Sequence, residues 1–360
     1  MKRPDIVFSG MRPTGRLHLG NYWGALKNWV RLQDEFAGRC FFSVVDWHML
    51  TTGYGDTSRL VENGREMVLD WLAAGVDPSK AVIFKQSDVP EHAELALMLA
   101  MVTPLSSVEN NPTWKEQLQE LAKTKAGMAA GGEATKYEEN KAGANYELRT
   151  YGFLGYPVLQ AADILLYHGT KVPVGQDQLP HLELSREIAR KFNHAFGPVF
   201  AEPQPLLTPT PKVPGLDGRK MSKSYGNAVD IAESSQSLAA KVRGAYTDPT
   251  RKRATDPGHP EPCAENPPGC SVFALDKLYA DADFVSRRRR ECMAGALGCS
   301  ACKNDLLGFM EPAFADFRGR REDYASRPGR VEEILAEGGS RAREVARKTM
   351  DEVRRAMRLR

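Results

Sequence analysis

Short apolar runs that alternate with stretches of helical spacing constrain the fold of this chain more than any other feature. The runs cover 5–10, 40–48 and 81–89. Between them, 16–36 and 56–75 repeat apolar residues at the spacing of one helical face. Strands that alternate with helices form parallel sheets through right-handed crossovers. The sequence therefore predicts an α/β protein built on a parallel sheet.

The remainder of the chain differs in composition from this first part. Residues 125–147 are rich in glycine and alanine and show no clear period, which predicts a mobile surface loop. The stretch 203–216 contains five prolines and leads into a lysine-rich loop, after which no strand pattern recurs. We therefore expect an α/β domain over 1–227, an α-helical domain over 228–340, and a terminal helix over 341–360 that packs back towards the first domain.

Composition excludes several classes of protein. The chain has 360 residues and a net charge of only +3, so any surface for nucleic acid must be a local patch. There is no run of eighteen apolar residues, and the apolar stretch at the N-terminus is too short for a signal peptide. We expect a cytoplasmic protein that does not span a membrane.

Two glycine-containing segments, 200 residues apart, carry the polar chemistry. In the first, Met11 to Gly24, a strand ends in a turn, and a helix begins near His18 and Gly20. Backbone amides at such a helix start receive negative charge, Gly20 leaves room for a flat base, and His18 can donate to a phosphate. The second segment, 218–227, places two lysines on a flexible loop.

The two segments resemble the two signatures of class I aminoacyl-tRNA synthetases. "RPTGRLHLGN" is similar to the first signature, and "KMSKS" matches the second in all five residues. The resemblance implies a Rossmann-like catalytic domain in which both signatures close around ATP and Mg²⁺ while an amino-acid carboxylate attacks the α-phosphate. It implies catalytic roles for His18, Lys115, Lys220 and Lys223. It implies an ATP site of Arg12, Pro13, Thr14, Gly20, Asn21, Gly175, Gln176, Asp177, Val213, Lys220, Met221, Ser222, Lys223 and Ser224.

The resemblance is strongest to the bacterial tryptophanyl-tRNA synthetase family and covers nearly the whole chain. It rests on "FSGMRPTGRLHLGNYWGAL", "VVDWH", "YPVLQAADILLY", "VPVGQDQLPHLELSREIARKFN" and "PGLDGRKMSKS". By position, Asp163 matches the acceptor for the indole N–H, and indole offers a donor but no acceptor. The implied tryptophan site consists of Phe8, His48, Tyr156, Gln160, Asp163, Val172, Val174 and Gln178.

Gln160 leaves a tyrosine-specific enzyme as an alternative. Tyrosine enzymes combine Tyr, Gln and Asp at the helical spacing of Tyr156, Gln160 and Asp163. They also use a tyrosine hydroxyl near the position of Phe8, and a phenylalanine cannot hydrogen-bond a phenol. This difference favours tryptophan. The sequence is also compatible with a nucleotidyltransferase of the same superfamily and with a non-catalytic relative that binds RNA.

Five of the six cysteines cluster near the C-terminal third, which suggests a metal site in a cytosolic chain. Cys270, Cys292, Cys299 and Cys302 have the spacing C-x21-C-x6-C-x2-C, which suits Zn²⁺ or an Fe–S cluster. "GCSACK" resembles a subset of tryptophanyl-tRNA synthetases that carry a [4Fe–4S] cluster. Cys263 competes with Cys270 as the first ligand, and reduced thiols without metal remain an alternative.

The resemblance also implies partners. These are tRNA(Trp), L-tryptophan, ATP and a second copy of the chain in a homodimer. Four consecutive arginines, Arg287 to Arg290, precede Cys292 in the domain expected to meet the anticodon. We expect this basic run to contact tRNA phosphates.

Overall fold

The computed structural model describes residues 4–112, 114–115, 150–207 and 213–359. The loop predicted over 125–147 therefore lies outside the described residues. The described residues contain no helix that is long and apolar enough to cross a membrane.

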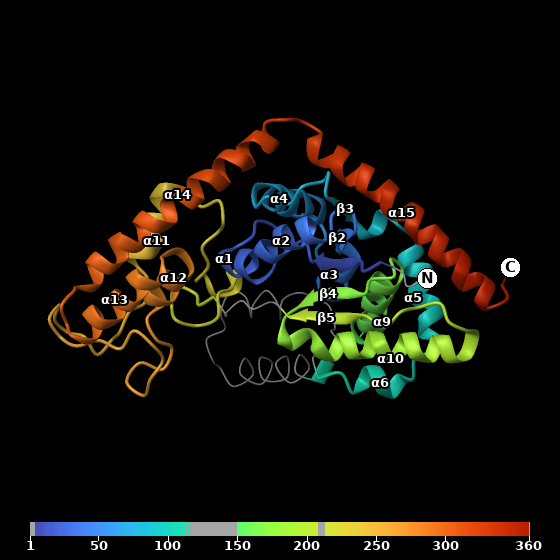
Figure 1. Ribbon diagram of the computed structural model, residues 1–360, viewed down its shortest axis with the longest axis horizontal. Helices are drawn as coiled ribbons and strands as arrows, with labels where there is room; N and C mark the ends of the chain where they lie inside the picture. Colours follow the sequence, from blue (N-terminus) through green and yellow to red (C-terminus); the bar gives the residue numbers. More distant parts are fainter. Residues whose placement is uncertain (1–3, 113, 116–149, 208–212, 360) are drawn as a thin grey trace.

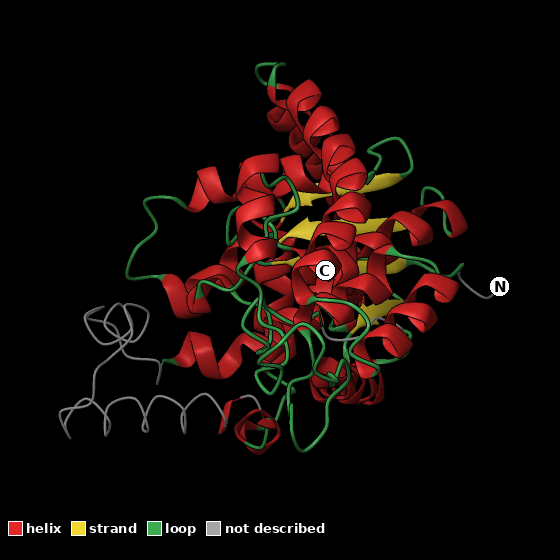
Figure 2. Cartoon of the chain, turned by 90° about the vertical axis from the view of Figure 1, so that its left-hand side faces the viewer, coloured by secondary structure: helices red, strands yellow, loops and turns green. Residues whose placement is uncertain are grey.

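In the described part of the chain, one five-stranded sheet forms the centre, with its strands in the order β3-β2-β1-β4-β5 (Figures 1 and 2). Every neighbouring pair is parallel, and Val7 pairs with Cys40 on one side and with Lys171 on the other. The chain thus builds one half of the sheet before it crosses β1 to build the other, which creates a topological switch point between β1 and β4. The strands are β1 (Val7–Met11), β2 (Cys40–Val44), β3 (Ala81–Lys85), β4 (Lys171–Val174) and β5 (Gln204–Leu207).

The strand β5 lies inside the proline-rich stretch, where the sequence predicts no strand. Among the described residues it pairs only with β4, so it is an edge strand of the sheet. Pro205 lacks an N–H and is tolerated in an edge strand, because an edge residue needs fewer ladder hydrogen bonds. The prolines therefore explain why the sequence pattern did not predict this strand.

Helices surround the sheet and then continue into a helical region (Figure 1). The predicted α/β fold with a helical C-terminal part is confirmed. The helical segments before 228 are α1 (Leu19–Asn21), η1 (Tyr22–Leu26), α2 (Lys27–Glu35), α3 (Asp46–Gly53), α4 (Leu60–Ala73), η2 (Gln86–Asp88), α5 (Glu91–Ala100), α6 (Leu105–Glu109), α9 (Tyr151–Leu165), η3 (Gln176–Gln178), α10 (Leu179–Phe196) and η4 (Lys223–Tyr225). Those after it are α11 (Ser235–Arg243), α12 (Ser271–Tyr279), α13 (Ala282–Met293), α14 (Cys299–Ala325) and α15 (Arg330–Ala356).

Alternate residues of the central strands enter two different hydrophobic cores. Phe42 points to the face covered by α2 and α4, where its ring stacks on Trp29 at 4.4 Å between centroids. Phe41 points to the opposite face and stacks on Tyr167 at 4.7 Å. Such period-2 alternation between two buried faces is expected of a sheet with helices on both sides.

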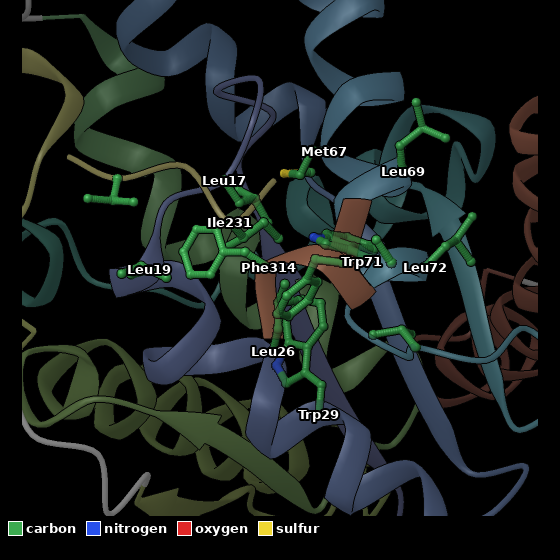
Figure 3. Packing of buried hydrophobic residues seen from close by; sticks show 14 of the residues in the cluster. Leu17, Leu19, Leu26, Trp29, Met67, Leu69, Trp71, Leu72, Ile231 and Phe314 are labelled. Carbon is green, nitrogen blue, oxygen red and sulfur yellow. The ribbon is translucent and has the colours of Figure 1, made fainter. Parts of the chain in front are cut away.

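The first of these cores extends into the helical region. Leu17 and Leu19, from the first signature, belong to the same buried cluster as Ile231 and as Phe314 of α14 (Figure 3). All four side chains are at most 1% exposed. The turn that carries His18 is therefore held from below by residues from both halves of the chain.

The last helix, α15, lies across β3 and contacts α4 and α5 (Figure 1). The helix expected over 341–360 forms the second part of this longer element, which begins at Arg330. Gly338 is the point of closest approach, because a Cβ built on it would lie 1.7 Å from the carbonyl oxygen of Ile83. Only a residue without a side chain lets the helix backbone come this near to the strand.

Candidate active site and cysteine centre

A cavity of about 820 Å³ opens at the carboxyl ends of β1 and β4, at the topological switch point. Open α/β sheets bind ligands at this position. Residues from the first signature line the cavity together with residues from α3, α9 and β4. The predicted site residues that line it are Phe8, Arg12, Thr14, His48, Tyr156, Gln160, Asp163, Val172, Val174, Gly175 and Gln178. Lining residues that sequence reasoning missed include Ser9, Met49, Thr52 and Phe153.

Asp163 lies at the wall of this cavity with its carboxylate held by three side chains. His48 Nε2 lies 2.9 Å from Oδ2, and His92 Nδ1 lies 2.6 Å from Oδ1. The amide of Gln86 donates to both oxygens at 2.8 and 3.0 Å. The other ring nitrogen of His92 is 2.7 Å from the hydroxyl of Tyr167. A chain of buried polar groups therefore fixes the orientation of the carboxylate.

This network keeps Asp163 ionised although it is only 2% exposed. Burial opposes ionisation, but the charge of His92 and the hydrogen bonds from His48 and His92 outweigh it and lower the pKa of Asp163 to about 2. Gln86 and His92 were not predicted as site residues. Gln86 could have been found because it directly follows a strand, at the edge where parallel sheets gather their polar side chains.

Aromatic and polar groups complete the wall. Phe8 stacks on Tyr167 at 5.6 Å and offers no hydrogen bond to the cavity. The hydroxyl of Tyr156 bonds to Nε2 of His181, which is buried and was not predicted. Val172 and Val174 are buried and also belong to the core below the sheet.

The first signature folds into a tight turn that His18 closes. Nδ1 of His18 accepts from the amide of Gly20 at 3.0 Å, and the side chain of Asn21 accepts from the amide of His18 at 3.1 Å. These are the reciprocal bonds of a capping box. Because Nδ1 is an acceptor, a neutral His18 carries its proton on Nε2, so that nitrogen is a hydrogen-bond donor.

The lysine-rich loop lies directly against this turn. Nζ of Lys223 donates to the carbonyl oxygen of Thr14 at 2.8 Å, and a Cβ built on Gly20 would lie 3.9 Å from Cβ of Met221. Burial, together with the charges of Lys223 and Lys220, lowers the pKa of His18 to about 4. Two segments that are 200 residues apart in the sequence therefore meet at Thr14, which lines the cavity, whereas His18, Lys220 and Lys223 are not among its lining residues.

The loop is held in this place by one buried side chain. Oδ1 of Asn227 accepts from the amide of Ser222 at 2.8 Å, while its amide donates to Asp217 at 2.7 Å and to the carbonyl of Lys220 at 3.2 Å. Asn227 is only 3% exposed. The backbone between 217 and 227 therefore curls around an internal anchor, with Gly226 in the left-handed region at φ 65°.

A second buried carboxylate ties the first signature to the helical region. Asp70 accepts from the amide of Leu17 at 2.6 Å and from Nε of Arg321, on α14, at 2.8 Å. Asp70 is 1% exposed. Burial raises the pKa of Asp70, and the bonds from Leu17 and Arg321 oppose that rise.

Several residues predicted for catalysis or ATP binding are not among those that line the cavity. Lys115 is exposed and donates to Asn110 at 3.0 Å, and it does not line the cavity. Val213 is buried under the lysine-rich loop, where its carbonyl accepts from Met221. Gln176 is exposed at the start of η3. Pro13 is buried within the signature, whereas the side chains of Asp177 and Ser224 lie outside the described residues.

The structure brings four cysteines from distant positions to one small cavity in the helical region. These are Cys270, Cys292, Cys299 and Cys302, which we call the cysteine quartet. Cys263 does not line that cavity. Among the described residues, no three thiols of the quartet have sulfur atoms that all lie within 4.8 Å of one another. A tetrahedral zinc ion with Zn–S bonds of about 2.3 Å would hold its thiolates roughly 3.8 Å apart.

Buried charges surround the quartet. Arg288 donates to Sγ of Cys302 at 3.3 Å, and Arg251 donates to Sγ of Cys299 at 3.6 Å. Within the described part of the chain, neither carboxylate oxygen of Asp276 has a hydrogen-bond partner, and burial raises the pKa of Asp276 to about 7. Arg288, one of the four arginines expected to contact tRNA phosphates, is only 4% exposed and faces the thiols instead.

Comparison with known proteins agrees with this geometry. The family model described as "tRNA synthetases class I (W and Y)" matches residues 1–306. A tryptophan–tRNA ligase from Aquifex aeolicus is 45% identical over 401 aligned positions that cover 98% of this chain and 99% of that protein. One from Thermotoga maritima is 46% identical, with coverage of 98% and 99%.

A solved structure shows the same similarity in three dimensions. Tryptophanyl-tRNA synthetase from Campylobacter jejuni, complexed with ADP and tryptophan, matches with a TM-score of 0.78 and 31% identity. The match covers 98% of this chain and 99% of that one. The agreement extends over both the sheet and the helical region. The chain therefore belongs to the class I tRNA synthetases of the tryptophan and tyrosine family.

Proposed function

We propose that this enzyme is a tryptophan–tRNA ligase, which joins tryptophan to AMP at the expense of ATP and then transfers it to tRNA(Trp). The observation that carries the proposal is the contact between the two signatures at Thr14, a residue that lines the same cavity as Asp163. Lys223 contacts the backbone of the first signature at Thr14, and His18 lies in the field of both lysines. ATP bound at this edge would have its phosphates beside the cations and its α-phosphate facing the cavity.

The adenylation step follows from these positions. A carboxylate oxygen of tryptophan attacks the α-phosphorus, the bond to the bridging oxygen breaks, and pyrophosphate leaves with Mg²⁺. Lys220 and Lys223 neutralise charge on the leaving group, and the neutral His18 donates from Nε2 to a phosphate oxygen. Because negative charge moves towards the lysines as the bond breaks, they stabilise the transition state more than bound ATP.

Selection of tryptophan is assigned to Asp163. Its carboxylate has about four acceptor positions, and His48, His92 and Gln86 occupy at least three of them. The indole N–H is a donor and can bind to the remaining acceptor position of the carboxylate. A phenol would also require a donor, and Phe8 provides none. This arrangement supports tryptophan over tyrosine, the alternative substrate.

ATP–pyrophosphate exchange with each of the twenty amino acids tests the assignment. We expect exchange with tryptophan, and exchange driven better by tyrosine would refute it. Lys223→Ala should slow exchange by at least about 100-fold, as loss of a transition-state contact does. Lys348→Ala removes an exposed lysine of α15 and serves as the matched control.

A substrate lacking the N–H tests Asp163 itself. A hydrogen bond to a charged acceptor contributes about 1.5–3 kcal/mol, so Asp163→Asn should raise KM for tryptophan by roughly 10- to 150-fold. An analogue with sulfur in place of the indole N–H should show a much smaller change. Equal losses for both substrates would mean that Asp163 acts only on folding.

For the cysteine quartet we propose a [4Fe–4S] cluster. The four thiols surround one cavity, no three of them all lie within 4.8 Å of one another, and the guanidinium groups of Arg251 and Arg288 reach two of them. In such a cluster each thiolate binds a different iron, so the four sulfur atoms lie farther apart than around one zinc ion. The cluster with its thiolates is negatively charged, and nearby N–H donors stabilise it. Both arginines line the cavity, and each guanidinium keeps a buried Nε without a partner among the described residues.

Iron and sulfide analysis of anaerobically purified protein tests this cluster, together with its visible spectrum. Cys302→Ser should remove the iron, and Cys263→Ser should retain it. If Cys263→Ser lost the iron and Cys270→Ser retained it, Cys263 rather than Cys270 would be the first ligand.

The helical region is proposed to bind tRNA(Trp) through exposed arginines around the quartet. Arg287, Arg289 and Arg290 remain exposed on α13. Arg287→Ala should weaken tRNA binding and reduce its dependence on salt. Unchanged affinity across salt concentrations would remove Arg287 from the interface.

A homodimer is the proposed assembly. Leu97 on α5, Met101 at the C-cap of α5 and Leu105 on α6 are 61%, 71% and 60% exposed. Exposed large apolar side chains that lie this near one another in the sequence favour a protein contact. Light scattering after size exclusion should give twice the chain mass of 39.9 kDa. Met101→Glu should shift it to the monomer.

A further inference from the structure

The loop between α11 and α12 brings three different metal-binding groups together outside the quartet. A ring nitrogen of His259, Sγ of Cys263 and a carboxylate oxygen of Glu265 all lie within 4.8 Å of one another. Among the described residues, this is the group of three that meets that distance. Cys263 is also the clustered cysteine that the quartet leaves unused.

A buried side chain holds the loop in this shape. The amide of Asn266 donates to the carbonyl of His259 at 2.8 Å, and its backbone N–H donates to Sγ of Cys263 at 3.3 Å. The N–H of Cys263 returns to the carbonyl of Asn266 at 3.1 Å, and Tyr246 donates to the side chain at 3.0 Å. Asn266 is 0% exposed. The approach of His259 to Cys263 is therefore fixed by the interior of the loop.

The imidazole of His259 is oriented by a second buried group. Oδ2 of Asp248 lies 2.8 Å from Nδ1 of His259 and accepts from its backbone amide at 2.6 Å. The side chain of Asp248 is 2% exposed, and Thr250 donates to its other oxygen. Histidines that bind metals almost always donate their second ring nitrogen to a carboxylate or carbonyl in this way. Asp248 would supply this partner for a metal bound at Nε2 of His259.

We infer that His259, Cys263 and Glu265 form a binding site for a single Zn²⁺ ion. Thiolate, imidazole and carboxylate together suit zinc, whereas Mg²⁺ and Ca²⁺ prefer oxygen ligands alone. Three protein ligands leave the fourth tetrahedral position to water. Binding releases the thiol proton of Cys263 to solvent. The site is independent of whatever group the quartet holds.

Zinc content and zinc affinity of the full-length protein test the inference. The chain, purified without added metal, is equilibrated with Zn²⁺, and free zinc is read with a competing chromophoric chelator while bound zinc is counted by elemental analysis. We expect one tightly bound zinc per chain. Asp248→Asn should weaken binding by about 10- to 100-fold, as loss of an orienting partner does.

Ligand variants separate this site from the quartet. Cys263→Ser and His259→Ala should lose the zinc, and Cys302→Ser should retain it. Circular dichroism of each variant checks that the helices persist. Zinc that survives both Cys263→Ser and His259→Ala, or that disappears only in Cys302→Ser, would overturn the inference. Wild-type protein that retains no zinc would do the same.

Discussion

Replacing Gly338 by alanine tests the contact between α15 and the sheet. In an unhindered helix this change stabilises by about 0.5–1 kcal/mol, because glycine loses more backbone entropy on folding. Here the new Cβ would lie 1.7 Å from the oxygen and 2.7 Å from the carbonyl carbon of Ile83. A backbone carbonyl inside a parallel sheet cannot rotate away, so the helix must move off the strand.

Overpacking of this kind costs about 1–3 kcal/mol, and a backbone obstacle places the cost at the upper end. After the helical gain is subtracted, we expect Gly338→Ala to destabilise the protein by about 1–2 kcal/mol. Gly339 is the matched control, since its new Cβ would meet Asp88 at an ordinary 3.4 Å. Gly339→Ala should be neutral or stabilising.

Urea midpoints and hydrogen exchange of the three proteins provide the assay. We expect a lower midpoint for Gly338→Ala and faster exchange confined to α15 and β3. If Gly338→Ala were as stable as Gly339→Ala, the close approach of helix and strand would be refuted.

Three further predictions concern charge. NMR titration should give His18 a pKa of about 4, and Lys223→Ala should raise this pKa because a nearby positive charge is removed. If the pKa of His18 were unchanged in Lys223→Ala, the two signatures would not lie close together. In the folded protein the pKa of Asp163 is about 2, below its ordinary value of 3.8. Ionisation of Asp163 therefore adds about 2 kcal/mol to the free energy of unfolding. This contribution is complete above pH 4 and is lost as the pH falls towards 2. Urea midpoints should therefore fall more steeply over this window in wild type than in Asp163→Asn. Arg321→Ala leaves Asp70 buried without its cation and should destabilise by about 3 kcal/mol, measured by the same midpoints against the exposed control Arg327→Ala.

Local patterns predicted the elements of the fold and part of the site. The alternating runs gave the first three strands, since period and length are properties of neighbouring residues. The resemblance named Tyr156, Gln160 and Asp163, and their spacing of four and three residues is that of one helical face. The resemblance contributed their roles, which spacing does not contain.

The features that sequence did not predict depend on contacts between distant segments. His92 and Gln86 reach Asp163 from elements more than seventy residues away. No local pattern marks His92, and the position of Gln86 directly after a strand does not identify Asp163 as its partner. Arg288 looks like its three neighbours in sequence, yet its position on α13 turns it inward to Cys302. The edge strand β5 was missed because proline outweighs the apolar pattern there.

The hydrophobic cluster beneath the first signature has a consequence for how the enzyme is divided. Cutting the chain after 227 would strip Ile231 and Phe314 from Leu17 and Leu19 and would expose Asp70 without Arg321. The buried cluster beneath the first signature is thus completed only by residues of the helical region. We therefore expect a fragment that ends at 227 to be less stable than the full chain, and a nascent chain to complete the packing around Leu17 and Leu19 only after α14 has been synthesised.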